Sequence, residues 1–355
     1  MKFHKVLLLL TVLLLCLSGC QNGNPPHTSG RTMVDGAGRT VSLPDQVERV
    51  VCVGVGALRY TCYMGAQQRV IGVERHETEQ TLDRLYNYVN HTHFSTLPVI
   101  GENGNPWPES ILSVAPQVIV LSAYAAADAE ELQAKTGIPV VVVPGSDSLL
   151  DEKAYETLRL LGILYGLEER TTELSAFLRE TQVELAQRTA GQSSPSVYVC
   201  GLSFQGAHGF EGTEAGYGPL LLIGAHNLAD TVGIPGAFDV DLEQVLVWDP
   251  DVIFVDFNGM GLIEQHRSAH PDFYRSLTAV QEGRVYTQIS FRSFAVNLDT
   301  ALANAWYAAS VLYPEQFSDV DPEDKAGEIF TILLGTNPYP ALKEAGYAFR
   351  PIQLL

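Results

Sequence analysis

The chain has 355 residues, of which 46% are hydrophobic, and its formal net charge at pH 7 is −19. A chain this acidic is repelled by nucleic acid and by anionic membrane surfaces, which excludes nonspecific binding to either. Its length and apolar content suffice for two hydrophobic cores of ordinary size.

The first residues have the pattern of a secretory signal. A basic start is followed by an apolar core, Val6 to Leu15, which is too short to span a bilayer. The run Leu17-Ser18-Gly19-Cys20 resembles the lipobox of bacterial lipoproteins, in which the cysteine is lipidated; an ordinary signal peptide with an incidental cysteine is the alternative. We predict a signal peptide over residues 1–19, a lipid anchor on Cys20 and a flexible, Pro/Gly-rich tether over residues 20–31. The protein is then extracytoplasmic and touches the membrane only through its lipid.

Residues 32–148 are predicted to form an α/β lobe. Met33 to Pro44 reads as two short strands around a glycine-rich turn, and Arg49 to Val53 as a buried strand that leads into a helix. Tyr86 to His93 is polar and aromatic, which favours a surface segment. Glu109 opens ESILSVAPQVIVLSA, which reads as a short apolar helix, a proline and a fully apolar strand. Uninterrupted apolar runs of this kind are typical of parallel strands covered on both faces.

Residues 149–191 are predicted to be helical. Gly166 to Gly191 contains no proline and no internal glycine, and its leucines and phenylalanine recur at helical spacing. At 1.5 Å per residue this helix would be roughly 34 Å long, about the diameter of a small domain. We expect one rigid helix that joins two lobes.

The second lobe, residues 192–355, repeats the pattern of the first. Glu243 opens EQVLVWDPDVIFVDF, with its glutamate, proline and apolar strand spaced as in the unit that Glu109 opens. Two helices complete the fold, one from Leu298 to Leu312 and one that begins at Asp321-Pro322, an N-cap followed by proline. The predicted fold is therefore α/β, with two lobes that each hold a mainly parallel sheet flanked by helices.

Several chemistries are disfavoured by the motifs. The Gly54-Val55-Gly56 turn lacks the third glycine of a dinucleotide fingerprint, because Arg59 stands in its place. Gly201 to Gly206 misses the nucleophile-elbow spacing by one residue. The three cysteines of the mature chain have no metal-binding spacing and are expected to be buried free thiols. His91 and His93 could hold a metal, but two histidines in a polar segment are more often solvated, so no metal site is expected.

An ordered series of segments carries a resemblance that covers nearly the whole mature chain. VDGAGRTVSLP, RVVCVGVGALRY, RVIGV, the Glu109 unit, the helical linker, the Glu243 unit and AVQEGRVY resemble the cobalamin/ferric-siderophore class of ABC-transporter substrate-binding proteins, also called class III periplasmic binding proteins. The resemblance implies two lobes bridged by a long helix, with a ligand in the cleft between them. It also implies a monomer that performs no catalysis, holds no cofactor and delivers its ligand to a permease dimer with its ATPase.

The same resemblance implies a role for two glutamates. In this class, one surface carboxylate on each lobe docks against arginines of the permease, and Glu109 and Glu243 stand at the matching positions. Two acidic points on a rigid body would give register and electrostatic steering toward a basic rim. The alternative is that each glutamate only stabilises the start of its helix.

The ligand is expected beyond the carboxyl ends of the strands, as in other open α/β sheets. Arginines there suit the carboxylates of an iron(III) chelate, and aromatic side chains suit its apolar faces. Each arginine could instead pair with a surface acid. The candidate cleft residues are Gly56, Arg59, Tyr60, Tyr124, Ser203, Phe204, Asn258, Phe291 and Arg292.

The C-terminal segment NLDTALANAWYAASVLYPEQF is most similar to class members that take up iron, so a siderophore-like iron(III) chelate is the expected ligand. A corrinoid, haem or a bare divalent metal ion remains an alternative ligand. An extracytoplasmic enzyme on the same architecture is the alternative of another class, although no spacing of a nucleophile or of paired catalytic carboxylates supports it.

Overall fold

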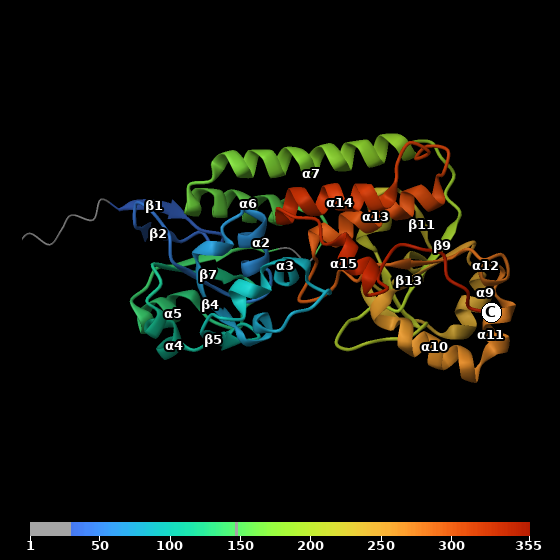
Figure 1. Ribbon diagram of the computed structural model, residues 1–355, viewed down its shortest axis with the longest axis horizontal. Helices are drawn as coiled ribbons and strands as arrows, with labels where there is room; N and C mark the ends of the chain where they lie inside the picture. Colours follow the sequence, from blue (N-terminus) through green and yellow to red (C-terminus); the bar gives the residue numbers. More distant parts are fainter. Residues whose placement is uncertain (1–29, 146–147) are drawn as a thin grey trace, which may run out of the picture.

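The structure is a computed structural model that describes residues 30–145 and 148–355. The predicted signal peptide, the lipid-anchored Cys20 and nearly all of the tether lie outside the described residues. Two α/β lobes lie side by side beneath one long helix (Figure 1). The two-lobe architecture predicted from the sequence is thus confirmed.

The N-terminal lobe is built on a sheet of order β6-β5-β4-β3-β7-β8. All neighbouring strands from β5 to β8 are parallel, whereas β6 at the edge runs antiparallel to β5. The central strands β3 and β7 are buried along their whole length, as their continuous apolar sequences require. The predicted hairpin forms as the antiparallel pair β1 and β2. The strands are β1 Arg31–Val34, β2 Thr40–Leu43, β3 Val50–Val53, β4 Val70–Glu74, β5 Val99–Glu102, β6 Asn105–Pro106, β7 Val118–Ser122 and β8 Val140–Val143.

The helices of this lobe cover its sheet, and one of them corrects the sequence reading. Residues 86–93, predicted to be a surface segment, belong to helix α3 (Leu85–Phe94), which buries Leu85, Tyr86, Asn87 and Phe94. Tyr86 and Asn87 are hidden because they donate hydrogen bonds to the buried carboxylate of Glu77, whereas residues 88–93 are half-buried or exposed. The other helices are α2 Ala57–Tyr63, α4 Pro108–Val114 and α5 Ala129–Thr136.

Two consecutive helices, α6 (Glu152–Tyr165) and α7 (Glu168–Thr189), link the lobes. Helix α7 runs along both lobes, as Figure 1 shows. Near its start, Arg170 donates hydrogen bonds to the carbonyl oxygen of Tyr63 in the N-terminal lobe. Near its end, Arg188 pairs with Asp319, which follows α13. The predicted bridging helix is present, and contacts at both of its ends fix its position.

The C-terminal lobe has a parallel sheet of order β11-β9-β13-β14 and a separate antiparallel ribbon of β10 and β12. The strands are β9 Ser196–Cys200, β10 Gly212–Ala215, β11 His226–Asn227, β12 Gly236–Asp239, β13 Val252–Asp256 and β14 Val285–Gln288. The helices are α8 Gly218–Leu222, α9 Leu242–Trp248, α10 Met260–Ala269, α11 Pro271–Ser276, α12 Thr278–Gln281, α13 Leu298–Leu312, α14 Pro322–Leu334 and α15 Tyr339–Glu344.

Helices α13 and α14 lie where the two lobes meet. Helix α13 is almost entirely buried and packs on α14 and α8, whereas α14 also contacts α2 and α3 of the N-terminal lobe. The bounds of α13 and the Asp321 cap of α14 match the sequence prediction. Cys52, Cys62 and Cys200 are buried free thiols, also as predicted. Within residues 30–145 and 148–355, none of the helices combines the length and apolarity that a membrane span needs.

Candidate functional site

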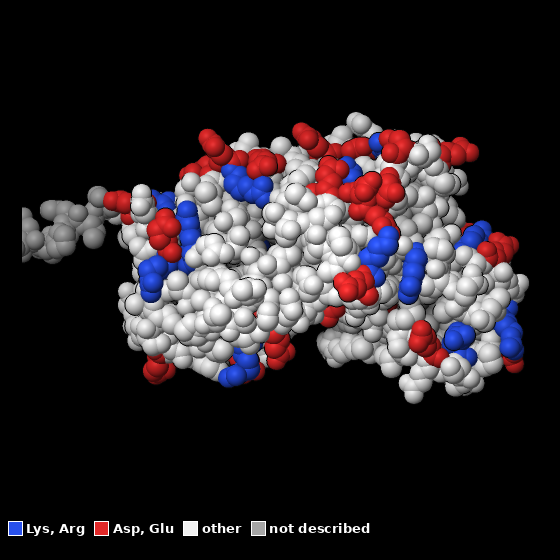
Figure 2. All heavy atoms as spheres, viewed as in Figure 1, with Lys and Arg blue, Asp and Glu red and all other residues white. Residues whose placement is uncertain are grey.

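The segments that follow the carboxyl ends of the strands meet between the lobes. Helix α2 follows β3, and its Arg59 contacts the loop that follows β14 in the other lobe. On the side away from α7, the space-filling view shows a notch between the lobes (Figure 2). A ligand site between the lobes is therefore geometrically available, as expected for open α/β sheets.

Arg59 does not lie in an open cleft. Its side chain is 1% exposed, and its guanidinium donates hydrogen bonds to the carbonyl oxygens of Ser293, Phe294 and Val296 at 3.0, 2.5 and 2.7 Å. These backbone acceptors already occupy both terminal nitrogens. The geometry thus corrects the expectation that Arg59 faces a ligand: in this structure it joins the two lobes.

Two further residues of the N-terminal lobe hold the same loop, and the sequence analysis did not single them out. The ring of His76 stacks on that of Phe294, with centroids 4.1 Å apart and an interplanar angle of 6°. The guanidinium of Arg84 lies 5.0 Å from the centre of the same ring. Phe294 and Ala295 both adopt positive φ angles, 52° and 66°, which non-glycine residues rarely do. Arg59, His76 and Arg84 therefore each contact this loop and hold its strained backbone in place.

Arg292, next to this loop, lines a pocket with a volume of about 450 Å³, which is formed by the C-terminal lobe and by Ser148 and Leu149 ahead of α6. Its Nε donates a 2.6 Å hydrogen bond to the carboxylate of Glu214, and its Nη2 bonds the other carboxylate oxygen. Burial of Glu214 raises the pKa of its carboxyl, an effect that the charge of Arg292 opposes. Nη1 of Arg292 donates to none of the described residues, so this edge of the guanidinium is available to a solute. The other lining residues are Ser148, Leu149, Ala215, Gly216, Gly218, Leu221, Leu222, Gly236, Phe291 and Val296.

The remaining candidates of the N-terminal lobe lie around the start of α2 and the end of β7. Gly56 precedes α2 with a φ of 89°, a conformation that strains any residue with a side chain. Tyr60 is 1% exposed, and its hydroxyl has no hydrogen-bond partner among the described residues. Tyr124 is 41% exposed, with the ammonium of Lys153 lying 5.9 Å from its ring centre. Of these three, only Tyr124 presents a substantial exposed surface.

The candidates of the C-terminal lobe fall into two groups. Phe291 is buried against Tyr217 and lines the pocket beside Arg292. Ser203 and Phe204 belong to the loop after β9, where the ring of Phe204 stacks on His208 with centroids 3.7 Å apart. Neither of these two residues lines the pocket of Arg292. Residues predicted to share one site thus belong to two separate features of this lobe, the Arg292 pocket and the loop after β9.

Asn258 lies at the end of β13 beside a buried acid. Its backbone N–H donates a 2.9 Å hydrogen bond to Asp256, whose carboxylate also accepts one from the Ser290 hydroxyl. Burial raises the pKa of Asp256 to about 7, although both hydrogen bonds oppose the shift. Asn258 also acts on Asp83 of the N-terminal lobe, because its side chain opposes the burial that raises the pKa of that carboxyl. Asn258 therefore lies at the junction of the lobes and outside the Arg292 pocket.

His91 and His93 are both engaged by the backbone. A ring nitrogen of His91 lies 3.3 Å from the carbonyl oxygen of Thr78, and one of His93 lies 3.1 Å from that of Val70. Within the described residues, they are not part of any group with metal-ligand spacing.

Comparison with known proteins identifies the family. The model of the periplasmic binding protein family matches residues 69–289, which is more than half of the chain. The chain belongs to the periplasmic binding protein family. It is thus a solute-binding protein and not an enzyme, and its class serves ABC importers outside the cytoplasm.

Individual relatives of this binding protein cover most of its length. The molybdate-binding protein MolA of Haemophilus influenzae is 23% identical over 335 residues, which span 87% of this chain and 92% of MolA. The structure of MolA bound to molybdate superposes with a TM-score of 0.66 at 20% identity, covering 86% of this chain and 98% of that one. A periplasmic solute binding protein from Veillonella parvula superposes with a TM-score of 0.69 at 19% identity, covering 87% of this chain and 94% of that one. The periplasmic heme binding protein HutB of Vibrio cholerae superposes with a TM-score of 0.56 at 18% identity, covering 75% of this chain and 99% of that one. These likenesses establish the fold.

Glu109 and Glu243 of this binding protein occupy equivalent positions. Each is exposed in the first turn of a seven-residue helix, α4 in one lobe and α9 in the other. Each helix ends at a non-glycine residue in the left-handed conformation, Ala115 or Asp249, directly before a proline. The repeat seen in the sequence is therefore also a repeat of local backbone conformation.

Proposed function

We propose that this binding protein captures an iron(III) chelate in the pocket of Arg292 and delivers it to an ABC permease. The observation that carries the proposal is the position of Arg292: it lies in the wall of a pocket of about 450 Å³ where the C-terminal lobe meets the segment that leads into α6, with one edge of its guanidinium unused by the described residues. Pockets for small molecules in proteins typically measure about 300–1,000 Å³. Leu221, Leu222 and Phe291 supply apolar surface beside this cation.

The arginine–glutamate pair sets a condition on the ligand. Glu214 is 2% exposed, so the pair is close to neutral as it stands, and an anionic ligand must share or displace the bond to Glu214. A planar guanidinium can serve two carboxylates at once, because its donors lie along different edges. An oxygen-rich chelate with several carboxylate or catecholate groups therefore suits this site better than a single point charge.

Molybdate is the second candidate, and the likeness to MolA over most of both chains favours it. Size argues for the larger ligand. A tetrahedral oxyanion has five heavy atoms and displaces only a few waters, at about 30 Å³ each, which would leave most of the pocket unfilled. Haem and corrinoids are further alternatives that would depend on the apolar wall rather than on Arg292.

Titration of the full chain with four ligand classes tests the proposal. We expect a ferric citrate or catecholate complex to bind more tightly than molybdate, haem or cobalamin, by calorimetry and by quenching of intrinsic fluorescence. Arg292→Ala should lower the affinity for the ferric complex about 10- to 150-fold, because a charge-assisted contact contributes roughly 1.5–3 kcal/mol. Arg292→Lys should restore only part of it.

The matched control is Arg275→Ala, because Arg275 is an exposed arginine of the same lobe that pairs with Asp272. Its affinity for the ferric complex should equal that of the wild type. If molybdate binds tightly and the other three ligands do not, the solute is the oxyanion and not the iron chelate. An unchanged affinity of Arg292→Ala for the true ligand would place the ligand elsewhere.

Docking to the permease is proposed to use Glu109 and Glu243 together with an apolar neighbour of each. Leu112 and Leu246 stand three residues after the two glutamates, on the same helix face, and are 47% and 38% exposed. An acidic group beside an exposed leucine is thus repeated on each lobe. The carboxylate would set register and approach, and the leucine would add buried apolar area on contact.

The anchor and the oligomeric state complete the proposal. The lipobox-like run before Cys20 supports a lipid anchor at the head of the tether. The binding protein is proposed to act as a monomer, because a permease dimer presents one site to one two-lobed partner.

A further inference from the structure

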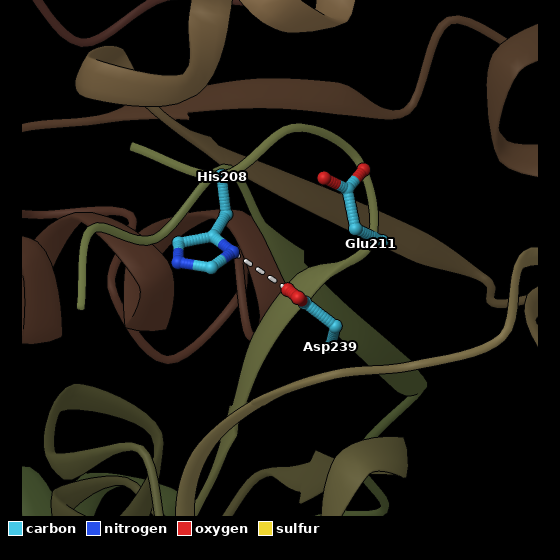
Figure 3. A group of neighbouring side chains, drawn as sticks. All are labelled: His208, Glu211 and Asp239. Atoms are coloured by element: carbon cyan, nitrogen blue, oxygen red, sulfur yellow. Dashed lines mark hydrogen bonds and ion pairs between the residues drawn. The ribbon is translucent and has the colours of Figure 1, made fainter. Parts of the chain in front are cut away.

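Three side chains with metal-ligating atoms converge at one end of the β10–β12 ribbon (Figure 3). His208 and Glu211 belong to the segment that leads into β10, and Asp239 is the last residue of β12. One ligand atom from each lies within 4.8 Å of the others. In the ribbon, Asp239 pairs with Gly212, directly after Glu211, so strand pairing holds the two carboxylates together.

The environment of His208 determines which of its ring nitrogens is available. Nε2 lies 2.8 Å from the carbonyl oxygen of Phe204, which can only accept, so Nε2 carries the proton. In the neutral imidazole, Nδ1 then presents a lone pair. This nitrogen lies 2.7 Å from Oδ1 of Asp239, which is an acceptor as well. Two acceptors this close repel each other unless a positive charge lies between or beside them. Metal-bound histidines commonly have this arrangement, in which the second ring N–H donates to a backbone carbonyl.

The local sequence makes room for the cluster through two glycines. A Cβ on Gly209 would lie 2.9 Å from the carboxylate of Glu211, whose Oε1 accepts the N–H of Gly209 at 3.0 Å. A Cβ on Gly212 would lie 2.3 Å from the Cβ of His208. A larger residue at position 212 would displace His208, and one at position 209 would make the carboxylate of Glu211 shift. The spacing His-Gly-Phe-Glu-Gly thus brings both side chains to the same side of the loop as Asp239.

We propose that His208 Nδ1, Glu211 and Asp239 form a binding site for a divalent transition-metal ion of the zinc type. One imidazole nitrogen and two carboxylates suit Zn²⁺, whereas Mg²⁺ favours an all-oxygen octahedral shell. The side chain of His208 is 21% exposed and that of Asp239 52% exposed, so the ion has access and keeps at least one position for water. The two carboxylates carry two negative charges, which a divalent cation neutralises and a single imidazolium does not.

The site is separate from the Arg292 pocket and has a structural consequence of its own. The pocket is lined by Ala215 and Gly236, which pair at the opposite end of the same ribbon. His208 stacks on Phe204, so an ion on His208 joins the loop after β9 to the end of β12. Metal binding is therefore expected to rigidify residues 203–208.

Isothermal titration of the full chain with Zn²⁺ alone, in the absence of any solute, tests the site. We expect one tight equivalent and no comparable binding of Mg²⁺. Asp239→Asn and Glu211→Gln keep the shape of each side chain and should each weaken Zn²⁺ binding more than the ~10- to 100-fold that loss of a partner outside the ligand set costs. Unchanged binding in the double variant overturns the proposal, as does the lack of a tight Zn²⁺ site in the wild type.

Two controls address other histidines of the same lobe. His226→Ala removes an exposed histidine of β11, and His270→Ala breaks the neighbouring pair of His266 and His270, whose ring centroids are 4.7 Å apart. Both variants should bind Zn²⁺ as the wild type does, and loss of the site in either would assign the ion elsewhere. Hydrogen exchange supplies an independent readout: Zn²⁺ should slow exchange of residues 203–208 in the wild type but not in Asp239→Asn.

Discussion

Nη1 of Arg59 donates a 2.7 Å hydrogen bond to the carbonyl oxygen of Val296, which lies 237 positions later in the chain. Nη2 of the same guanidinium bonds the carbonyl oxygens of Ser293 and Phe294. One buried cation of the N-terminal lobe thus satisfies three backbone acceptors of the other lobe. This arrangement fixes the position of the loop that precedes α13, and with it the position of Arg292.

Arg59→Ala should therefore act mainly on stability. It removes the donors of the carbonyl oxygens of Phe294 and Val296, whereas that of Ser293 still accepts a hydrogen bond from the side-chain amide of Asn297. At a cost of roughly 1–3 kcal/mol for each of the two, we expect the free energy of unfolding to fall by about 2–6 kcal/mol. Urea denaturation followed by circular dichroism measures the loss. Arg275→Ala should stay within about 0.5 kcal/mol of the wild type. A variant of Arg59 that is as stable as the wild type but no longer binds solute would restore Arg59 as a ligand residue.

Glu214→Gln should strengthen the binding of an anionic solute. The substitution removes the negative charge that now engages Nε and Nη2 of Arg292, so less of the cation has to be shared. We expect a gain of roughly tenfold in affinity for the ferric complex, measured by calorimetry. Burial raises the pKa of Glu214, and protonation removes the same negative charge as the substitution does. The affinity of the wild type should therefore increase as the pH falls through that pKa, whereas the affinity of the variant should not. A loss of affinity in Glu214→Gln would mean that the carboxylate itself contacts the solute.

Asp256→Asn should stabilise the protein at neutral and alkaline pH. The pKa of Asp256 is about 7 in the folded chain, above its ordinary value of 3.8, so its contribution to stability is fully present below about pH 4 and declines as the pH rises to about 7. The amide stays neutral, and its oxygen still accepts hydrogen bonds from Ser290 and from the N–H of Asn258. Thermal melts should show the variant near the wild type at about pH 4 and more stable by the order of 1–4 kcal/mol at about pH 8. A pH-independent difference would contradict the raised pKa.

Replacing Glu109 and Glu243 by alanine should reduce uptake without changing the solute Kd. Leu112→Ser with Leu246→Ser should do the same to a smaller extent, because each leucine is exposed and does not line the Arg292 pocket. Glutamate-to-lysine reversal at both positions should abolish docking, since like charges facing each other cost several kcal/mol. Transport assays with reconstituted permease measure the effect. Val183→Ser, on the exposed face of α7, is the matched apolar control and should transport normally.

Cys20→Ser should release the protein from the membrane fraction. The expectation follows from the Leu17-Ser18-Gly19-Cys20 run and the absence of apolar residues in the tether that follows. Fractionation of cells and immunoblotting measure the partition. Membrane association equal to that of the wild type would show that Cys20 is not the anchor.

The architecture could be predicted from the sequence because its determinants are local. Continuous apolar runs identify β3, β7 and β13 as buried parallel strands, and the proline-free stretch between Gly166 and Gly191 identifies α7. The cap of α14 at Asp321 follows from the same kind of local signal. Local patterns fail at the start of α3, where Tyr86 and Asn87 are buried because Glu77, which lies outside the helix, accepts their hydrogen bonds.

The candidate site was predicted only as a set of strand ends, and the tertiary structure decided what each residue does there. Arg59 and Arg292 look alike in sequence, each in a segment that follows a strand, yet one is enclosed by backbone carbonyls and the other lines a pocket beside Glu214. The placement of His208 beside Asp239 likewise depends on the pairing of β10 with β12. The sequence by itself determined the two lobes, the bridging helix and the matched glutamates, because helix and strand signals arise from neighbouring residues. Which charged groups are buried, paired or accessible was decided by the fold, because their partners lie tens to hundreds of positions away and meet only when the lobes pack.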